Sequence, residues 1–351
     1  MAPRRQLVFA NSVDYARHTG GWVYNTRAMH ELAGLGWEVQ PLDLPAGFPR
    51  PDNQAKARSV QLLAVLPDRT LVVADQICLS PLANAVTREA DRLRFVMIFH
   101  HPIAREQGLS ARQRLMFSEK ERRALAGCRL VVATSPTTAD ELVADYAVDP
   151  GRIVVASPGI ERFEPSMLKA SGVPRMLSVG AVIERKGYHL LVEALSELRE
   201  IPWHLDIVGD LDRAPAYVEA LRARIGAAGL DGRIVLRGGL DATDLEACWR
   251  SSDIYASASL HEGYGMAIAD AIARGLPTVT TSAGAVGEWL DPDAAIIAPE
   301  ATPDSLRAAL TRVLVNPELR STLRTGALRQ TSRFPTWADT AQVISERLSG
   351  L

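Results

Sequence analysis

The sequence predicts an α/β protein made of two doubly wound domains, each a mainly parallel sheet with helices on both faces. The chain has 351 residues, which is too long for one ordinary core and suits two α/β domains. Short apolar runs alternate with helical patterns along almost its whole length, and such alternation implies right-handed strand-helix-strand crossovers. One turn-rich segment interrupts this pattern near 157–174, after which it starts again.

The apolar runs of the first half lack strict alternation, as expected for parallel strands that are covered on both faces. The predicted strands are Leu7–Ala10, Glu38–Leu42, Thr70–Ala74, Arg94–Phe99, Arg129–Ala133 and Ile153–Ala156. The helical patterns between them include Asn25–Leu35, Ala55–Leu66 and Ala111–Leu125. The first half therefore contains a complete sheet with its own helices.

The second half repeats this organisation after the turn residues Ser157-Pro158-Gly159. Its predicted strands are Arg175–Val179, His204–Val208, Ile234–Arg237, Ile254–Ser257, Thr278–Thr281 and Ala294–Ala298. We therefore expect a first domain over 1–158, a linker over 159–174 and a second domain over 175–335. A last amphipathic helix over Trp337–Leu348 is expected to pack back, with the rest of 336–351, on the first domain. Ligands of such folds bind at the carboxyl ends of the strands, here in a cleft that both domains face.

Composition excludes several classes of protein. The 39 basic and 41 acidic residues leave a net charge of −2, so no global field attracts nucleic acid or an anionic membrane. The three cysteines, Cys78, Cys128 and Cys248, share no ligand spacing, and we expect small buried side chains in a reducing compartment. No uncharged apolar run approaches the roughly 18 residues of a membrane span. We expect a cytoplasmic protein, at most peripheral to a membrane, of undetermined oligomeric state.

The strongest motif is His261-Glu262-Gly263-Tyr264-Gly265-Met266, which leads into a helical pattern over Ala267–Ala273. Backbone N–H groups at a helix N-terminus attract phosphate, and glycine lets a phosphate come close. Glu262 can accept hydrogen bonds from sugar hydroxyls. Asp270 follows eight positions later, about two helical turns, and returns to the same face. The pattern suits a nucleotide sugar.

A second motif places cations at a helix start. Leu177-Ser178-Val179-Gly180 ends a predicted strand, and Arg185-Lys186-Gly187 opens the helical pattern Tyr188–Leu198. Because the helix dipole disfavours cations there, Lys186 indicates that an anion arrives at this position.

Two motifs of the first domain follow predicted strands. Thr19-Gly20-Gly21-Trp22 lies between the first predicted strand and a helix. This glycine pair is not the GxGxxG motif of dinucleotide-binding folds, and no GxGxxG with an acidic residue about twenty positions later follows a predicted strand. The sequence therefore disfavours a nicotinamide dehydrogenase. His100-His101-Pro102, with Glu106 beyond it, ends the fourth strand. Adjacent residues there face opposite ways, so one of the two histidines is expected to be functional.

The stretch from Ser259 through Glu262 and Asp270 to Pro277 resembles the E-x7-E element of glycosyltransferase family 4, the retaining GT-B enzymes with two Rossmann-like domains. Gly180 to Gly187 is similar to the Gly-Arg…Lys-Gly element of that family, and Gly20-Gly21 to its N-terminal glycine loop. Matches in family order extend from Gly20 to Glu288. Two positions depart from the family: Asp270 stands in place of the second Glu, and Ala181 in place of the Arg after Gly180.

The resemblance implies a role for each matched residue. His100 or His101, with His100 preferred, and Lys186 and Glu262 would carry the catalysis, and Glu262, Gly263 and His100 would hold the sugar. Asp270, directly or through water, would hold the nucleoside with Arg237, Gly238 and Gly209, and Glu106 and Trp22 would lie on the acceptor side. The donor diphosphate would contact Gly20, Gly21, Arg185, Lys186, Gly263, Tyr264, Gly265 and Met266, with Arg185 a candidate to replace the Arg missing at Ala181.

These assignments predict transfer of a sugar from a nucleoside-diphosphate sugar, with UDP or GDP preferred, to a small-molecule, glycan or lipid-linked acceptor. No cofactor and no metal are expected. Asp210-Leu211-Asp212 and Asp291-Pro292-Asp293 match the metal-binding DxD pattern formally, but we interpret both as surface turns. An epimerase or phosphorylase on the same fold, and a non-catalytic nucleotide-sugar binder, remain as alternatives.

Overall fold

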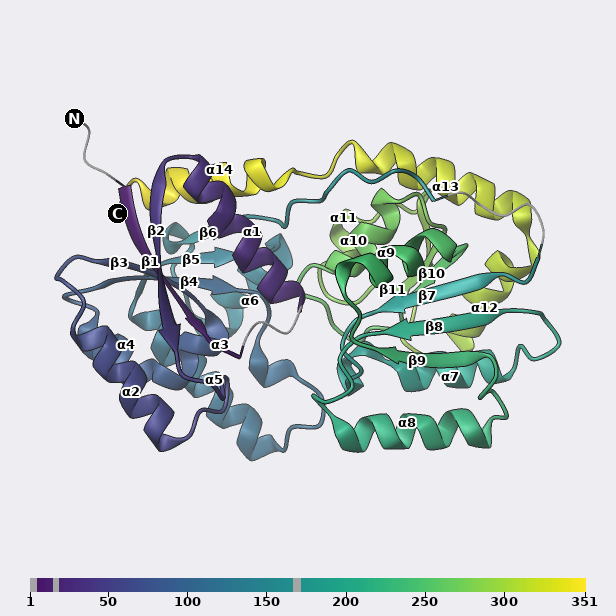
Figure 1. The fold of residues 1–351 in the computed structure, drawn as a ribbon, viewed down its shortest axis with the longest axis horizontal. Helices are drawn as coiled ribbons and strands as arrows, with labels where there is room; N and C mark the ends of the chain where they lie inside the picture. Colours follow the sequence, from purple (N-terminus) through teal and green to yellow (C-terminus); the bar gives the residue numbers. More distant parts are fainter. Residues whose placement is uncertain (1–4, 15–18, 167–171) are drawn as a thin grey trace. The chain divides into compact units, whose positions relative to one another are not determined.

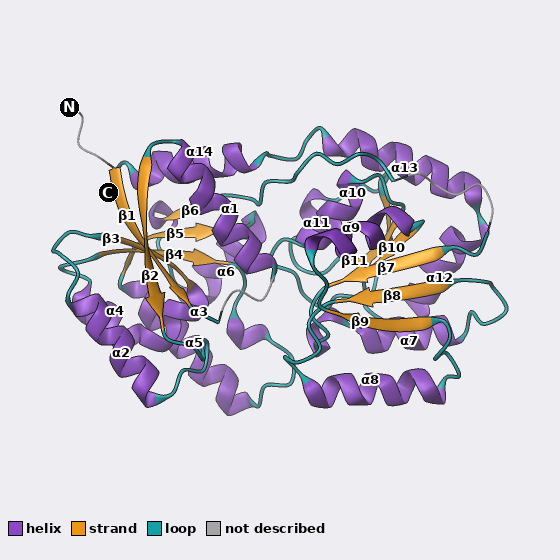
Figure 2. Ribbon diagram, viewed as in Figure 1, coloured by secondary structure: helices purple, strands orange, loops and turns teal. Residues whose placement is uncertain are grey.

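A computed structural model describes residues 5–14, 19–166 and 172–351 of the chain. The chain divides into two compact units, one made of residues 1–159 and 335–351 and the other of residues 160–334. In the described residues each unit holds a six-stranded parallel sheet (Figures 1 and 2). The predicted α/β class with two doubly wound sheets is therefore confirmed.

The sheet of the first unit has the strand order β2-β1-β3-β4-β5-β6, and each neighbouring pair runs parallel. Its strands are β1 (Arg5–Ser12), β2 (Trp37–Leu44), β3 (Leu71–Asp75), β4 (Arg94–Phe99), β5 (Cys128–Ala133) and β6 (Ile153–Val155). Its helices are α1 (Gly20–Gly34), α2 (Asn53–Ala64), α3 (Gln76–Leu79), α4 (Ala83–Glu89), α5 (Ala111–Ala126), α6 (Pro136–Tyr146) and α14 (Trp337–Leu348).

The second unit has the strand order β12-β11-β10-β7-β8-β9, again with parallel neighbours. Its strands are β7 (Arg175–Val179), β8 (His204–Val208), β9 (Ile234–Gly238), β10 (Ile254–Ala256), β11 (Thr278–Thr281) and β12 (Ala295–Ala298). Its helices are α7 (Tyr188–Ser196), α8 (Pro215–Ala227), α9 (Ala242–Ser251), α10 (Met266–Ala273), α11 (Val286–Trp289), α12 (Pro303–Val315) and α13 (Pro317–Thr331).

All twelve strands lie where the sequence predicts them, with ends that differ by at most two residues. The sequence signal is strong because every residue of β3 and of β10 is buried, and all of them except Asp75 are apolar or aromatic. The predicted start of α1 at Asn25 is wrong by five residues. Gly20 and Gly21 belong to its first turn, because the Thr19 hydroxyl caps the helix by accepting from the Trp22 N–H at 3.2 Å.

The C-terminal helix α14 packs against α1 within the first unit (Figure 1). The Trp37 indole N–H donates to the Ser345 hydroxyl at 2.9 Å, and the rings of Tyr24 and Trp337 meet edge to face with centroids 5.8 Å apart. The Thr340 hydroxyl also donates to the Ser157 carbonyl at 2.7 Å. These contacts join the last helix of the chain to the sheet that the first half builds.

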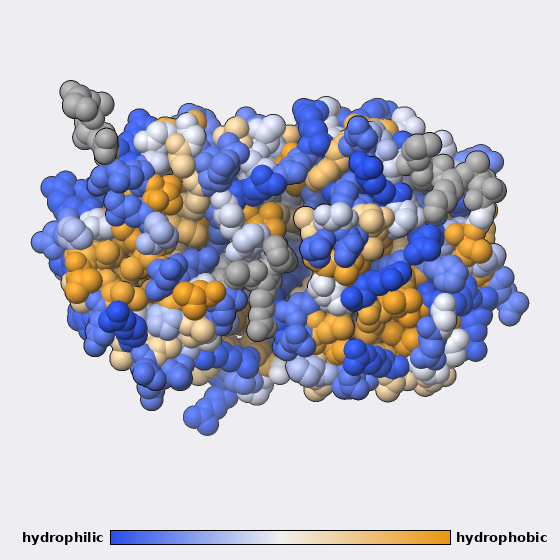
Figure 3. All heavy atoms as spheres, in the orientation of Figure 1, coloured by the Kyte–Doolittle hydropathy of each residue, from blue (hydrophilic) through white to orange (hydrophobic). Residues whose placement is uncertain are grey.

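Hydrophilic residues predominate on the molecular face drawn in Figure 3, and apolar residues form separate patches within it. Cys78 and Cys128 are buried as predicted, whereas Cys248 is only half-buried. All three are free thiols. Over residues 5–14, 19–166 and 172–351, no helix combines the length and the apolar character needed to cross a membrane.

Gly159 is the point at which the packing of α14 can be tested. A Cβ atom on Gly159 would lie 2.2 Å from the backbone N of Trp337, so Gly159→Ala must displace the start of α14. We expect a loss of about 1–3 kcal/mol of stability, as for other overpacked sites, measured as a lower thermal midpoint. Gly34→Ala is the matched control, since nothing lies within 4 Å of its added Cβ. An unchanged midpoint for Gly159→Ala would contradict this packing.

Candidate active site

The centre of the candidate site in the second unit is the carboxylate of Glu262, which lies in the loop between β10 and α10. Glu262 is 8% exposed. Its Oε1 accepts from the Lys186 ammonium at 2.6 Å and from the Ser259 hydroxyl at 2.6 Å. The Arg185 guanidinium lies 3.5 Å from Oε2. Two cations and a hydroxyl therefore surround one buried acid.

These partners keep Glu262 ionised. Burial alone would raise its pKa, but the charges of Lys186 and Arg185 and the hydrogen bonds from Lys186 and Ser259 lower the pKa to about 2. At neutral pH Glu262 is a carboxylate that only accepts hydrogen bonds. It is suited to binding hydroxyls and not to donating a proton.

Backbone contacts fix the two cations. Arg185 and Lys186 lie in the short 3-10 turn Glu184–Lys186, and Gly187, with a φ of +66°, is the N-cap residue of α7. A Cβ on Gly187 would lie 1.9 Å from the Ala258 carbonyl oxygen, so only glycine fits this close approach. The Leu260 N–H donates to the Arg185 carbonyl at 2.8 Å, and the Arg185 guanidinium donates to the His261 carbonyl at 2.6 Å. The turn is thereby joined to the Glu262 loop.

The same loop is fixed from its other side by residues that the sequence analysis did not single out. A Cβ on Gly284, whose φ is +59°, would lie 2.1 Å from the Glu262 carbonyl oxygen. The Ala285 N–H donates to that oxygen at 3.1 Å, and the Thr281 hydroxyl donates to the Ser259 carbonyl at 2.5 Å. The Ser-Ala-Gly segment after the predicted strand at Thr278–Thr281 was the available sequence signal, since turns after strands line such sites.

Helix α10 begins directly after the Glu262 loop, and no side chain caps its first turn. Gly265 is its N-cap residue, with a φ of +93°. Tyr264 is buried because its ring stacks on Trp289 with centroids 5.3 Å apart, and the Trp289 indole N–H donates to the Tyr264 carbonyl at 2.8 Å. Gly263 and Met266 are half-buried on either side. The arrangement provides helix N-terminal N–H groups beside Glu262, a geometry that binds anions.

A glycine stands at the carboxyl end of each of three neighbouring strands: Gly180 follows β7, Gly209 follows β8, and Gly238 is the last residue of β9. A Cβ on Gly209 would lie 1.9 Å from the Gly180 carbonyl oxygen, and the Gly209 N–H donates to the Gly238 carbonyl at 2.9 Å. Glycine therefore permits the close backbone contact at this edge. Beside it, Arg237 pairs with Asp206, with Nε 2.8 Å from Oδ1.

Asp270 lies on α10, and its carboxyl group has no hydrogen-bond donor among the described residues. Burial raises the pKa of Asp270 to about 6, with Glu161 and Glu246 acting in the same direction and Arg274 opposing them. Asp270 and Glu262 therefore differ: hydrogen bonds and nearby cations stabilise the charge of Glu262, whereas Asp270 has only the charge of Arg274 acting against its burial.

In the first unit, His100 follows β4 and joins a buried polar cluster. Its Nε2 lies 3.2 Å from the Asp75 carboxylate and 3.2 Å from the Asn25 amide oxygen. The Asn25 amide also donates to Asp75 at 2.8 Å, and both residues are 0% exposed. Tyr24 packs edge to face against the His100 ring, with centroids 5.2 Å apart. The imidazole is thus oriented by a carboxylate, an amide and an aromatic ring.

The two histidines have different partners. The Gln76 side chain accepts from the His100 N–H and donates to the His101 carbonyl, which fixes the backbone after β4. The His101 ring instead lies 2.7 Å from the Glu106 carboxylate. Gly20, Gly21 and Trp22 form the first turn of α1, the helix that also carries Asn25.

A buried acid supports the segment beyond His101. Glu121 of α5 is 0% exposed and accepts from the Ile103 N–H at 2.7 Å and from the Tyr146 hydroxyl at 2.7 Å. Burial raises the pKa of Glu121 to about 7, although these hydrogen bonds oppose the rise. Glu121 thus holds the chain two residues after the histidine pair.

Both DxD matches form tight turns. The Asp212 N–H donates to the Asp210 side chain at 2.7 Å, and the Asp293 N–H donates to the Asp291 side chain at 2.9 Å. The Oδ2 atom of Asp210 is buried and accepts no hydrogen bond within the described parts of the chain. Those parts contain no group of three or more His, Cys, Asp or Glu side chains that could hold a metal ion.

Comparison with known structures places the two-unit fold among the GT-B glycosyltransferases. Sucrose-phosphate synthase from Thermosynechococcus elongatus aligns over 99% of each chain with a TM-score of 0.83 and 16% identity. The Anabaena protein HepE, solved in complex with UDP and glucose, aligns over 98% of this chain and 99% of its own with a TM-score of 0.78 and 18% identity.

Two family models match the chain in succession: "Glycosyltransferase Family 4" over residues 44–162 and "Glycosyl transferases group 1" over residues 159–330. The chain belongs to the family 4 glycosyltransferases. A curated relative, the MMP alpha-(1->4)-mannosyltransferase of Mycolicibacterium hassiacum, is 28% identical over 86% of this chain and 75% of its own length. The D-inositol 3-phosphate glycosyltransferase of Paenarthrobacter aurescens is 33% identical over 47% of this chain and 44% of its own length.

Sequence reasoning missed the residues that support the predicted ones. Asp75 ends β3, and the rule that functional groups follow the strands of such sheets could have found it. Asn25 is a polar residue on the buried face of α1, which is a weaker signal. Nothing in the local sequence indicates Gln76 or Glu121, because their partners come from other elements.

The raised pKa of Glu121 gives a pH dependence with a definite sign. Between pH 4.5 and about 7 the folded protein holds a proton that the unfolded chain releases. The stability of the wild type should therefore fall as pH rises through this window, by up to about 3 kcal/mol. Glu121→Gln should lack this component of the pH dependence in denaturant titrations at pH 5 and pH 8. Parallel pH profiles for the two proteins would refute the raised pKa.

Proposed function

We propose that the protein transfers a sugar from a nucleoside-diphosphate sugar to an acceptor hydroxyl. The nucleoside diphosphate of the donor is UDP or GDP, and the anomeric configuration of the sugar is retained. One observation carries the proposal: Glu262, buried and ionised, lies 2.6 Å from the Lys186 ammonium, next to the uncapped start of α10. A carboxylate that can bind the hydroxyls of a sugar therefore lies next to cations that can bind its phosphates. The HepE complexes with UDP and UDP-glucose support this donor class.

The diphosphate is assigned to Lys186, Arg185 and the segment Gly263–Met266, with Gly20 and Gly21 contributing from the first unit. An ammonium group has three donors, so Lys186 can keep its bond to Glu262 and still donate to a phosphate oxygen. The N–H groups at the start of α10 add partial positive charge without the desolvation of another cation.

The sugar is assigned to Glu262, Gly263 and His100, and the nucleoside to Asp270, Arg237, Gly209 and Gly238. Glu262 accepts from two sugar hydroxyls, for which its ionised state is suited. Asp270 has no internal donor and takes ribose hydroxyls, directly or through water. The backbone edge formed by Gly180, Gly209 and Gly238 gives a flat base room to approach, because no side chain projects from it.

In the first unit, His100 is the group assigned to the reacting sugar, and His101, Glu106 and Trp22 are assigned to the acceptor. Asp75 and Asn25 act as positioning residues, because they orient the His100 imidazole. The acceptor class is a hydroxyl of a small molecule or glycan, free or linked to a lipid. The relatives named as an inositol-phosphate glycosyltransferase and a mannosyltransferase support hydroxyl acceptors.

The proposed reaction proceeds on one face of the sugar. The bond between the anomeric carbon and the phosphate oxygen breaks, the acceptor oxygen forms the new bond, and the acceptor proton passes to the leaving phosphate. Lys186 and the α10 N–H groups stabilise the charge that develops on this phosphate. Glu262 is held by Lys186 and Ser259, which suits it to bind sugar and not to attack it as a glycosidase carboxylate would.

Incubation of the protein with the donor, with and without an acceptor, distinguishes the proposed transferase from an epimerase, a phosphorylase and a non-catalytic binder. An epimerase changes the donor without any acceptor, and a phosphorylase needs only phosphate as its acceptor. A non-catalytic binder leaves donor and acceptor mixtures unchanged. A thermal-shift panel of UDP, GDP, ADP and their sugars identifies the donor to use, since a ligand well above its Kd stabilises by several kcal/mol.

Removal of either partner of the central ion pair should abolish turnover. Lys186→Ala and Glu262→Ala are each expected to lower kcat by at least ~100-fold, because each removes a charge-assisted contact to the donor in the transition state. Arg185 and Ser259 remain beside Glu262 in Lys186→Ala, so the fold should persist, as checked by circular dichroism. Lys56→Ala is the matched control and should retain full activity. A near-normal kcat for either site variant would make the assignment wrong.

We further propose that transfer needs no divalent cation, because Lys186, Arg185 and the α10 N-terminus supply the positive charge. Activity should survive dialysis against EDTA within about twofold. Asp210→Asn and Asp291→Asn should leave any response to added manganese unchanged. Activity that disappears in EDTA and returns with manganese would instead assign a metal to the donor diphosphate.

A further inference from the structure

A second anion site is suggested by a cavity of about 470 Å³ at the amino-terminal edge of the first unit's sheet. Its lining contains four arginines and one aspartate, together with Leu93 and the last two residues of the sequence, Gly350 and Leu351: the charged side chains are Arg69, Arg92, Arg94, Arg129 and Asp91. The cavity is within the size range of small-molecule sites. Its excess of guanidinium groups suits phosphate, which arginine binds with two parallel hydrogen bonds.

The arginines come from three neighbouring strands. Arg69 precedes β3, Arg94 begins β4 and Arg129 is the second residue of β5, and these strands are adjacent in the sheet. Strands lie about 4.8 Å apart, so the three positions span about 10 Å. That span fits one or two phosphate groups. The site is distinct from the one that holds His100, because Arg94 and His100 lie at opposite ends of β4, about 20 Å apart.

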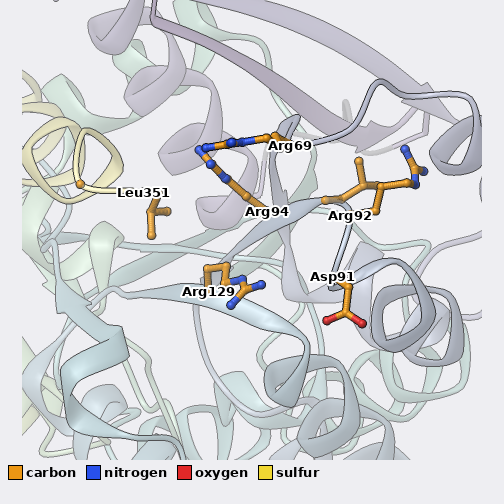
Figure 4. Close-up of a pocket in the computed structure, with 8 residues that line it drawn as sticks. Arg69, Asp91, Arg92, Arg94, Arg129 and Leu351 are labelled. Carbon is orange, nitrogen blue, oxygen red and sulfur yellow. The ribbon is translucent and has the colours of Figure 1, made fainter.

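Two of these guanidinium groups are positioned without an internal partner. Figure 4 shows the side chains of Arg69 and Arg94 converging at their charged ends. Neither side chain donates to any acceptor in the described residues, and Asp91 pairs with neither of them. Arg94 is also half-buried. Arg69 is exposed. Like charges that point toward one another repel, and an anion bound between them would reduce that repulsion.

The other two arginines are differently engaged. Arg92 points away from this pair in Figure 4 and is bound to Glu89, with Nη2 2.8 Å from Oε2, and to carbonyls at the end of α2. Arg129 makes a single long hydrogen bond to the Ala90 carbonyl, at 3.4 Å. Arg92 therefore serves the fold, whereas Arg69, Arg94 and Arg129 are available to a ligand.

The backbone at Arg69 supports a role for its side chain. Arg69 has a φ of +66°, a left-handed conformation that a glycine or asparagine adopts at lower cost. The turn is held by the Arg69 N–H, which donates to the Arg92 carbonyl at 2.6 Å, and by the Thr70 N–H, which donates to the Pro67 carbonyl at 3.2 Å. Arginine occupies a position whose backbone favours glycine.

We propose that Arg69, Arg94 and Arg129 form a second anion site, for a ligand that carries a phosphate or diphosphate group. The phosphate belongs to a soluble metabolite or to the headgroup of an anionic lipid. The chemistry of recognition is the same for both sources, and the experiment separates them.

The test is calorimetric titration of the full chain with inorganic pyrophosphate. Because pyrophosphate also suits Lys186, all variants are made on Lys186→Ala, which weakens the donor site. We expect saturable binding that weakens at least tenfold in Arg69→Gly/Arg94→Gln. The matched control is Arg58→Gln/Arg112→Gln, which removes the same charge from exposed positions of the same unit and should bind as its parent.

The Arg69→Gly substitution also separates ligand binding from folding. Glycine suits the left-handed turn, so the thermal midpoint of Arg69→Gly should be equal to or above that of its parent. A loss of pyrophosphate binding then reflects the missing guanidinium and not a misfolded turn. A lowered midpoint would assign Arg69 to the fold and overturn its place in the site.

Flotation with phosphatidylglycerol and phosphatidylcholine vesicles identifies the source of the phosphate. Pyrophosphate binding together with flotation on phosphatidylglycerol but not phosphatidylcholine vesicles, if the flotation requires Arg69 and Arg94, assigns a lipid headgroup. Pyrophosphate binding without vesicle binding assigns a soluble ligand. The proposal is overturned if pyrophosphate does not bind. It is equally overturned if the Arg69/Arg94 variant and the Arg58/Arg112 control bind alike.

Discussion

The second unit depends on a charge that it buries. Glu262 is almost fully enclosed, and an uncompensated carboxylate there would cost several kcal/mol. Lys186, Arg185 and Ser259 compensate it, and they do so only because Gly187 and Gly284 let the neighbouring backbones come close. The ion pair thus fixes the Glu262 loop against the Lys186 turn. A rigid carboxylate beside rigid cations is what a nucleotide-sugar site requires.

The first unit also buries a carboxylate, that of Asp75, and compensates it with a different set of groups. Asp75 and Asn25 are fully buried, and they satisfy each other and the His100 ring. Gln76 and Glu121 then hold the backbone on either side of the histidine pair. The polar groups at the carboxyl ends of β3 and β4 are therefore preorganised, so that little rearrangement of this unit is needed to present an imidazole.

The sequence predicted the twelve strands and the positions of Glu262, Lys186 and His100 because these depend on local signals: buried apolar runs, glycine turns and residues at strand ends. It did not predict the groups that hold them. Ser259 lay inside a recognised motif, but its bond to Glu262 depends on the fold of the loop. Asn25, Asp75 and Glu121 act across gaps of 18 to 75 residues, which periodicity does not reveal. The start of α1 was misplaced because glycines usually indicate loops.

In the proposed function, Lys186 is held in place to receive a diphosphate. The most direct measurement is the Kd of the nucleoside diphosphate selected by the thermal-shift panel, for the wild type, Lys186→Met and the control Lys56→Met. Lys186→Met should weaken binding at least ~10-fold, which corresponds to about 1.4 kcal/mol, while the control should bind as the wild type does. A Kd for Lys186→Met within twofold of the wild type would contradict it.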